Sequence, residues 1–293
     1  MIIQRMMRLK CLSNFIRPYQ WIKNLIILVP LVFGQKLLDI RLFLECCFMV
    51  FIFSLAASSV YLINDIVDLK EDKQHQEKKK RPLASGQINI YQAVIVAFIL
   101  GVVSVLIAFA LNGYAGWIVL FYIGANYIYA KSFKSIPILD ILCIALFFYL
   151  RILLGSVVIQ IMPSNWIILS AILLALFLVL NKRRHDLELS KVFSRIHKRY
   201  TIYFVDCAIY VVLLLIIVVY ALYTIDAVTV NKFGTNYLIY TIPCVYYGLF
   251  RYLYLVNKRS FPRDPVYFLH KDRIMQLNLI TWISLCIIFI YFV

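Results

Sequence analysis

The chain of 293 residues carries more apolar side chains than a water-soluble protein of this length needs, since 63% of its residues are hydrophobic and only 15% are charged. Together with a mean hydropathy of +0.87, this composition excludes a soluble globular fold and predicts an all-α, polytopic membrane protein. The net charge of +16 is compatible with nucleic-acid binding. The basic residues lie in short segments between apolar runs, however, where anionic lipid and phosphorylated substrates account for them. We therefore expect no nucleic-acid partner.

Nine apolar runs are candidates for membrane spans, because a helix needs about 20 apolar residues to cross a bilayer. They cover residues 21–39, 42–64, 90–111, 115–130, 137–158, 164–181, 203–224, 236–257 and 274–293. No linker, fixed repeat or low-complexity tract divides the chain. We therefore predict one membrane-embedded domain over residues 1–293, and a homo-oligomer is left open.

The distribution of basic residues predicts the orientation of these spans. With the N-terminus in the cytoplasm, 25 of the 30 Lys and Arg residues lie in inner segments. Those segments are 1–23, 65–89, 131–136, 182–202 and 258–273. The outer loops hold only Lys36, Arg41 and Lys232. We therefore expect a cell-membrane protein whose chemistry faces the cytoplasm.

The first inner segment ends in Arg17-Pro18-Tyr19-Gln20-Trp21-Ile22-Lys23-Asn24, directly before the first span. Gln20 and Asn24 are four residues apart, which places them on one helical face beside Lys23. Arg17 and Lys23 are also long enough to reach lipid phosphates from a span end. Two interpretations stay open: a lipid-facing anchor, or a polar face that contributes Arg17, Gln20, Lys23 and Asn24 to a binding site.

The second span ends in Asn64-Asp65-Ile66-Val67-Asp68-Leu69-Lys70-Glu71-Asp72. These intervals place Asp65, Asp68 and Asp72 on one face if the helix continues, with Asn64 close to it. Such acids would repel one another unless a hard divalent cation bound them, and Mg²⁺ held in this way usually bridges to substrate phosphates. We predict that Asn64, Asp65, Asp68 and Asp72 bind Mg²⁺ and that the three aspartates are catalytic.

A basic cluster, Lys78-Lys79-Lys80-Arg81, follows the acids and supplies donors for a polyanion. Charge runs between spans are ordinarily solvated loops, and that interpretation stays open. The regular spacing of the acids at a helix end favours a metal–diphosphate site, to which Lys78 and Arg81 contribute substrate-binding groups.

The third inner loop carries Tyr129 and Lys134, and Asp140 and Arg151 follow in the fifth span. An ionised side chain at the membrane centre costs about 2.5–3.5 kcal/mol on insertion scales, so Arg151 is expected to face the bundle interior. It either pairs with a carboxylate such as Asp140 or binds substrate. Gly155, four residues later, permits close approach of another helix.

The fourth inner segment opens with Lys182, Arg183 and Asp186, which again places acids beside bases at a helix end. Positive flanking of a span explains the two bases but not Asp186. Such a cluster could face the first one across the mouth of the bundle and bind one anionic headgroup. Arg251, near the last inner segment, is a further candidate for substrate binding.

The seven cysteines and four histidines lack the spacing of a metal site or of a disulfide framework. We interpret the cysteines as small residues of the core. The histidines, which we interpret as polar loop residues, are His75, His185, His197 and His270.

The pattern Asn64-Asp65-x-x-Asp68-x-x-x-Asp72 resembles the first signature of the UbiA superfamily of intramembrane prenyltransferases. Further stretches resemble one branch of it, the decaprenyl-phosphate phosphoribosyltransferases, across nearly the whole chain. These stretches are Arg17-Pro18-x-Gln20-Trp21-x-Lys23-Asn24, Lys78-x-x-Arg81-Pro82-x-Ala84-x-Gly86, Lys134 through Asp140 to Arg151-x-x-x-Gly155, Lys182-Arg183-x-x-Asp186-Leu187, and Tyr240-x-x-Pro243 through Arg251-Tyr252 to Asp264-Pro265 and Asp272-Arg273. Asp186 departs from an expected Glu, and Gln76 from a frequent Pro.

This resemblance implies a nine-helix bundle with a cytoplasm-facing pocket. It implies Mg²⁺-dependent transfer of 5-phosphoribosyl from phosphoribosyl diphosphate to a polyprenyl phosphate, which releases diphosphate and gives a cell-wall precursor. Two other functions stay open: prenyl transfer from an isoprenyl diphosphate to an aromatic acceptor, and transport of an anionic solute. Transporters tend to carry broken helices and polar sites at the membrane midplane, whereas polarity here collects on one face.

Overall fold

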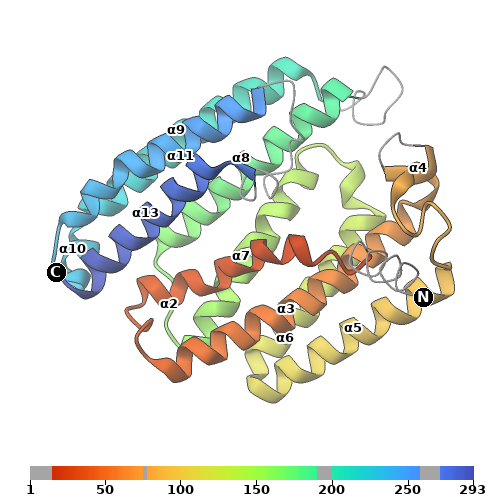
Figure 1. Ribbon diagram of the computed structural model, residues 1–293, viewed down its shortest axis with the longest axis horizontal. Helices are drawn as coiled ribbons and strands as arrows, with labels where there is room; N and C mark the ends of the chain where they lie inside the picture. Colours follow the sequence, from red (N-terminus) through yellow and green to blue (C-terminus); the bar gives the residue numbers. More distant parts are fainter. Residues whose placement is uncertain (1–14, 75–77, 190–199, 258–270) are drawn as a thin grey trace. The chain divides into compact units, whose positions relative to one another are not determined.

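The computed structural model describes residues 15–74, 78–189, 200–257 and 271–293 (Figure 1). Over these ranges the chain folds into helices and connecting turns, with no β-strand. Six of the helices are long and apolar enough to cross a membrane. They are Ile40–Val67, Ile90–Leu111, Leu139–Ile159, Asn165–Glu188, Ile202–Ile225 and Arg273–Tyr291. The predicted all-α, multi-pass architecture is confirmed to this extent.

The other three predicted spans are helical as well, but they fall outside that set. The first, Pro18–Phe33, is a shorter apolar segment made of the 3₁₀ helix η1 (Pro18–Leu28) and the α-helix α2 (Val29–Phe33). The others correspond to α6 (Gly113–Lys131) and to α11 (Ile242–Asn257), which has 16 residues. The count of nine spans and the side of the N-terminus therefore stay predictions.

The described residues group into two compact units. Unit 1 comprises Met1–Leu31, Leu37–Asp140 and Leu150–Met162, and unit 2 comprises Val32–Lys36, Ile141–Tyr149 and Pro163–Val293. The description of one domain over residues 1–293 stays a prediction.

Unit 1 is built around α3 (Ile40–Val67), which packs against η1, α5 (Ile90–Leu111) and α6 (Figure 1). Asp39 caps the N-terminus of α3 by accepting hydrogen bonds from the N–H groups of Arg41 and Leu42. Where α3 meets α5, the Ser59 hydroxyl donates to the Ala97 carbonyl at 2.6 Å. Helix packing of this kind, with small residues at the contact, is typical of membrane proteins, because lipid tails give no hydrophobic drive for helix association.

The helix α7 (Leu139–Ile159) approaches η1 closely at Gly155. A Cβ atom built on Gly155 would lie 2.0 Å from the carbonyl oxygen of Ile27 and 3.3 Å from Pro30 Cδ. The contact therefore requires glycine, as the sequence led us to expect. It fixes η1 against the part of α7 that carries Arg151.

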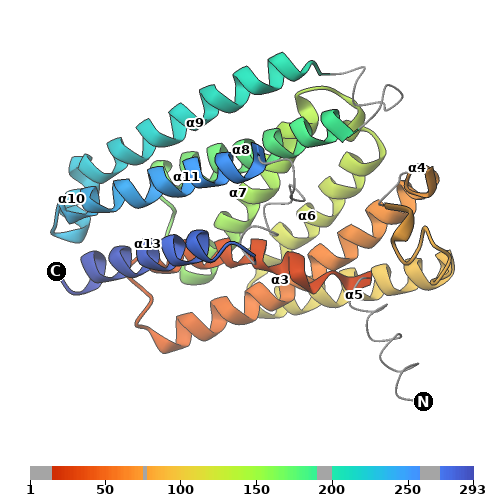
Figure 2. The same cartoon turned by 45° about the horizontal axis from the view of Figure 1, so that its top comes forward.

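Unit 2 contains α8 (Asn165–Leu189), α9 (Ile202–Ile225), α11 and α13 (Arg273–Tyr291), with α10 (Ala227–Phe233) and η4 (Tyr237–Thr241) between α9 and α11 (Figure 2). Aliphatic and aromatic side chains, most of them from α8, α9 and α11, form an apolar cluster in this unit. A buried polar link joins three of its elements, since Trp282 Nε1 donates to Tyr220 Oη at 2.9 Å and Tyr220 shares a hydrogen bond with Thr241. All of these polar atoms are therefore satisfied within the apolar interior.

We predict that Gly155→Ala lowers stability, because the new methyl group must displace the Ile27 backbone, and overpacking typically costs about 1–3 kcal/mol. Gly124→Ala is the matched control, since Gly124 lies in α6 and has no atom within 4 Å of a built Cβ. The measurement is the thermal unfolding midpoint of the purified protein in detergent. Equal midpoints for the two variants would contradict the close approach.

Candidate metal–anion site

The acidic stretch does not continue as one helix. Helix α3 ends at Val67, Asp68 adopts φ −85° and ψ 1°, and α4 (Leu69–Gln74) begins at the next residue. The Asp68 carbonyl accepts hydrogen bonds from the N–H groups of Glu71 and Asp72, both at 2.9 Å, and so starts the new helix. The condition under which the three aspartates would share one helical face, an unbroken helix, is therefore not met.

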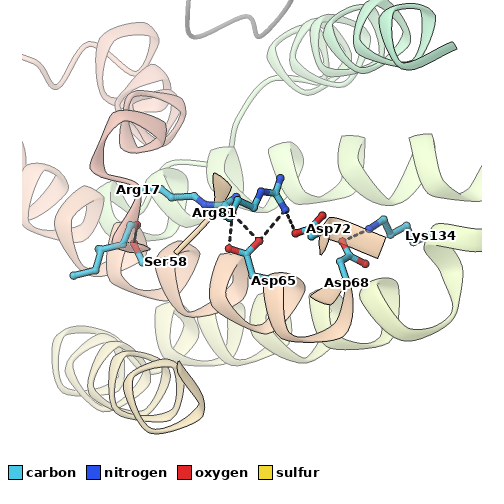
Figure 3. Close-up of polar contacts among 8 residues, drawn as sticks. Arg17, Ser58, Asp65, Asp68, Asp72, Arg81 and Lys134 are labelled. Atoms are coloured by element: carbon cyan, nitrogen blue, oxygen red, sulfur yellow. Dashed lines mark hydrogen bonds and ion pairs between the residues drawn. The ribbon is translucent and has the colours of Figure 1, made fainter. Parts of the chain in front are cut away.

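The break at Asp68 brings Asp65 and Asp72 to the same arginine (Figure 3). The Arg81 nitrogen NH1 donates to Asp65 Oδ1 at 3.0 Å and to Asp72 Oδ2 at 2.5 Å. Both carboxylates are buried, with Asp65 4% and Asp72 2% exposed. One cationic atom therefore bridges two buried acids from different helices.

Arg17 is the second cation on Asp65. Its nitrogen NH2 donates to both carboxylate oxygens, at 2.6 and 2.5 Å, and its guanidinium lies 5.6 Å from the centre of the Tyr61 ring. Arg17 takes a left-handed conformation, with φ 58° and ψ 54°, directly before η1. Non-glycine residues adopt this conformation at an energetic cost. The residue that pairs with Asp65 is therefore also strained in its backbone.

Arg81 is held in place by a compact loop. The N–H of Arg81 bonds the carbonyl of Lys78, and the N–H of Ser85 bonds the carbonyl of Arg81. Leu83, two residues on, is 4% exposed and lies in an apolar cluster with Leu62 of α3. Leu83 therefore anchors the loop that carries Arg81 on the helix that carries Asp65.

Asp68 lies apart from this bridge and forms an ion pair with Lys134, from the short 3₁₀ helix η3 (Phe133–Ser135) (Figure 3). The same loop holds Ile138 at φ 68° and ψ −46°, and the N–H of Leu139 bonds the Pro137 carbonyl at 2.8 Å. This is a γ-turn of the rare, strained form, on a β-branched residue. The loop that presents Lys134 to Asp68 is thus backbone-strained.

Burial raises the pKa of the Asp72 carboxyl above its ordinary value, because desolvation disfavours the charged form. The positive charges of Arg81 and Lys78 act in the opposite direction and favour the ionised carboxylate. Lys78 thus acts electrostatically on the same acid as Arg81. Asp72 depends on these cations for its charge.

The donor set fits a magnesium ion that is shared with a substrate. Within the described ranges, no three His, Cys, Asp or Glu side chains lie close enough to form a complete metal cage. Asp65 and Asp72 nevertheless meet at one cationic nitrogen, so two hard oxygen donors already converge on one position. Mg²⁺ commonly takes one or two carboxylates and completes its octahedron with water and substrate phosphates. Asp65 and Asp72 would hold such an ion.

The remaining residues predicted for this region have different surroundings. Lys23, Asn64 and Lys78 are partly exposed, and Gln20 and Tyr129 are buried. Asn24 is 1% exposed and donates to the Ser54 hydroxyl at 2.9 Å. The assignment of these residues to substrate binding stays a prediction.

Arg151 is 4% exposed and contacts amide, phenol and aromatic groups of unit 1. Its Nε donates to Asn24 Oδ1 at 2.9 Å and its NH2 to Tyr122 Oη at 3.4 Å. The guanidinium also lies 5.0 Å from the centre of the Phe53 ring and 5.3 Å from that of Tyr122. Phe53 precedes Asp65 by twelve residues of α3, a rise of about 18 Å. Arg151 is therefore far along the helix from the carboxylate bridge.

The alternative of a direct Arg151–Asp140 ion pair is wrong. Both residues lie in the continuous helix α7, eleven residues apart. At about 1.5 Å per residue the separation along the axis is roughly 16 Å, more than the two side chains can span. The sequence did not predict that Arg151 contacts Asn24 and Tyr122. One signal was present in α3, where Ser54, Ser58 and Asp65 recur at near-helical intervals and form one polar stripe. Ser54 accepts a hydrogen bond from Asn24. Ser58 accepts a hydrogen bond from Trp21 Nε1 at 3.0 Å.

The second predicted cluster lies in unit 2. Arg183 and Asp186 form an ion pair at 3.6 Å on α8, and Lys182 is exposed. Arg251 donates to Asp272, the N-cap of α13, at 2.8 Å. The Arg251–Asp272 contact joins α11 to the start of α13, whereas the Arg183–Asp186 pair lies within α8. Roles of Lys182, Arg183, Asp186 and Arg251 in substrate binding stay predictions.

Several residues named from the sequence lie outside the described ranges. They are Cys11, His75, Gln76, His197, Asp264, Pro265 and His270.

Comparison with known proteins places these features in a family context. The model of the UbiA prenyltransferase family matches residues 26–292. A decaprenyl-phosphate phosphoribosyltransferase of Mycobacterium tuberculosis is 27% identical, over 92% of this chain and 90% of that protein. One of Mycolicibacterium smegmatis is 29% identical, over 96% and 92%. A UbiA homolog from Archaeoglobus fulgidus, solved with DMAPP and Mg²⁺, shares the fold at a TM-score of 0.69 and 17% identity, over 96% of this chain and 99% of that one.

We predict that Arg151→Met destabilises the protein by about 1–3 kcal/mol, because the buried Asn24 and Tyr122 oxygens lose a charged donor. Metal-dependent binding of inorganic diphosphate should change less than twofold. The measurements are the thermal unfolding midpoint and a diphosphate titration by calorimetry. A loss of diphosphate affinity at unchanged stability would instead assign Arg151 to the substrate.

Proposed function

This chain belongs to the UbiA prenyltransferase family, and we propose that it transfers 5-phosphoribosyl from phosphoribosyl diphosphate to a polyprenyl phosphate of decaprenyl-like length. The acids and bases gathered at one end of α3 carry this proposal. Asp65, Asp68 and Asp72 are matched there by three cations. A site with both sets suits a metal-bound diphosphate next to further phosphate groups. Similarity to two curated decaprenyl-phosphate phosphoribosyltransferases over more than 90% of this chain supports the substrate assignment.

In the proposed reaction the bond from ribose C1 to the diphosphate oxygen breaks, and a bond from C1 to an oxygen of the lipid phosphate forms. The transition state resembles the oxocarbenium ion of other glycosyl transfers. When bound, Mg²⁺ neutralises the charge that develops on the departing diphosphate.

The residues of the chain hold the reacting groups. Asp65 and Asp72 would hold the ion, and Arg17, Arg81 and Lys78 would bind the diphosphate oxygens. Lys134, which pairs with Asp68, would bind a second phosphorylated group. The lipid phosphate is already anionic at neutral pH, so its oxygen attacks C1 without a strong base. The proposed reaction therefore does not require a histidine base.

The proposal includes the membrane arrangement predicted from the sequence. Nine spans with a cytoplasmic N-terminus would place the end of α3, α4 and the Lys134 loop at the cytoplasmic face of the cell membrane. A water-soluble sugar diphosphate would then reach the site from the cytoplasm, and the lipid phosphate from the bilayer. The product would serve as a cell-wall precursor.

We predict that the purified protein consumes phosphoribosyl diphosphate in the presence of Mg²⁺ and a polyprenyl phosphate, with stoichiometric release of diphosphate, and that chelation of the metal stops the reaction. The measurement is a phosphorus-31 or radiolabel assay of lipid-linked phosphoribose. Activity with an isoprenyl diphosphate and a hydroxybenzoate, without phosphoribosyl transfer, would establish aromatic prenylation instead. Solute flux in liposomes that persists after Asp65→Ala would establish transport.

We predict that Asp65→Asn lowers kcat/KM at least about 100-fold, because it removes a metal ligand, and each 1.4 kcal/mol of lost transition-state stabilisation costs tenfold in rate. Glu71→Gln is the control, because this substitution also removes one negative charge but at an exposed position on α4. Size-exclusion elution of both variants in detergent reports whether they fold. Full activity of a folded Asp65→Asn protein would exclude its catalytic role.

A further inference from the structure

The acids and the bases of the site form ion pairs with each other. Arg17 and Arg81 occupy Asp65, Arg81 occupies Asp72, and Lys134 occupies Asp68 (Figure 3). These cations are the groups that a diphosphate needs, and these carboxylates are the groups that a metal needs. The cations therefore compete with a metal for the carboxylates, and the carboxylates compete with a diphosphate for the cations.

The competition is sharpest at Arg81. Its NH1 atom lies within 3.0 Å of both Asp65 and Asp72, the position at which a bridging cation would contact the two carboxylates. A metal ion can take these oxygens only after the guanidinium has left them. Both acids are nearly inaccessible to water and the Arg81 side chain is 28% exposed, so a displaced guanidinium regains only part of its hydration.

From these contacts we infer that Arg81, assisted by Arg17, acts as an internal substitute for the metal, so that a divalent cation and a diphosphate displace the ion pairs together. Either ligand alone must separate a buried ion pair and leave one charge without compensation. When both arrive, the carboxylates exchange a guanidinium for the metal and the guanidinium exchanges a carboxylate for phosphate oxygens. The inference rests on the proposed metal–diphosphate function and adds a reason why neither ligand binds well by itself.

The inference predicts that removal of Arg81 changes metal affinity differently from removal of a residue that only binds phosphate. If Arg81 only bound phosphate, its removal would leave metal binding in the absence of phosphate unchanged. If it is the internal counter-ion, its removal frees Asp65 and Asp72 and strengthens that binding. By the same argument, removal of Asp72 frees Arg81 and strengthens binding of diphosphate in the absence of metal.

The first experiment measures binding of Mn²⁺, as a probe for Mg²⁺, to the full-length protein in detergent by the loss of the free-ion EPR signal, without phosphate. Arg81→Met should lower the Mn²⁺ dissociation constant about tenfold, within the 5–150-fold range of typical coupling between sites. Lys73→Met is the matched control, because it removes one charge from an exposed position on α4 and should change the constant less than twofold. Equal shifts in the two variants, or none in Arg81→Met, would overturn the inference.

The reciprocal experiment keeps the inference testable if Arg81→Met fails to fold. Inorganic diphosphate is titrated calorimetrically in chelator-treated buffer, and Asp72→Asn should bind it about tenfold more tightly than the unaltered protein. Glu71→Gln is the control of equal charge change. Weaker or unchanged binding in Asp72→Asn would overturn the inference. Neither assay uses a sugar or a lipid, so the two proposals can fail separately. If the variants change affinity as expected but the protein transfers no phosphoribosyl group, only the proposed function is wrong. If the protein transfers the group but the variants leave both affinities unchanged, only the inference is wrong.

Discussion

The carboxylates of Asp65 and Asp72 are buried at the end of a membrane helix, and this burial requires positive charge beside them. The protein meets the requirement with Arg81 between the two acids and Arg17 on Asp65. Other local features follow from the same requirement. The break at Asp68 turns Asp72 toward Arg81, Leu83 anchors the loop that carries Arg81, and Arg17 accepts a left-handed backbone to reach Asp65.

The position of Arg17 depends in turn on how η1 lies against α3 and α7. Three hydrogen bonds hold η1 in place: Trp21 to Ser58, Asn24 to Ser54, and Arg151 to Asn24. The close approach of Gly155 to Ile27 completes this attachment. Arg151 is stabilised in this interior because its amide, phenol and aromatic partners replace water around the guanidinium. Its contact with Asn24 in turn gives Arg151 a structural role. The interior of unit 1 and the acidic site are linked through η1.

The site also separates its three acids into two groups. Asp65 and Asp72 converge on one cation, whereas Asp68 pairs with Lys134 on a strained loop. This division supports a two-carboxylate metal site completed by a substrate, in place of a cage made by the protein alone. Lys134 is thus held by an acid that lies in the same stretch as Asp65 and Asp72 but outside their bridge.

The sequence by itself determined the class of protein and the chemistry at its disposal. Apolar composition, basic loops and the Asn64–Asp72 pattern were sufficient for an all-helical membrane protein of the UbiA family, because hydropathy and short-range spacing are local properties. They also singled out Asp65, Asp72 and Arg81, which the structure brings into contact. Local spacing failed where a backbone break or a distant partner decided the outcome. A continuous helix would have aligned three aspartates, but Asp68 ends it. Only the tertiary structure decided that Arg17 meets Asp65 from 48 residues away and that Arg151 meets Asn24 from 127 residues away, since such pairings depend on how whole helices pack.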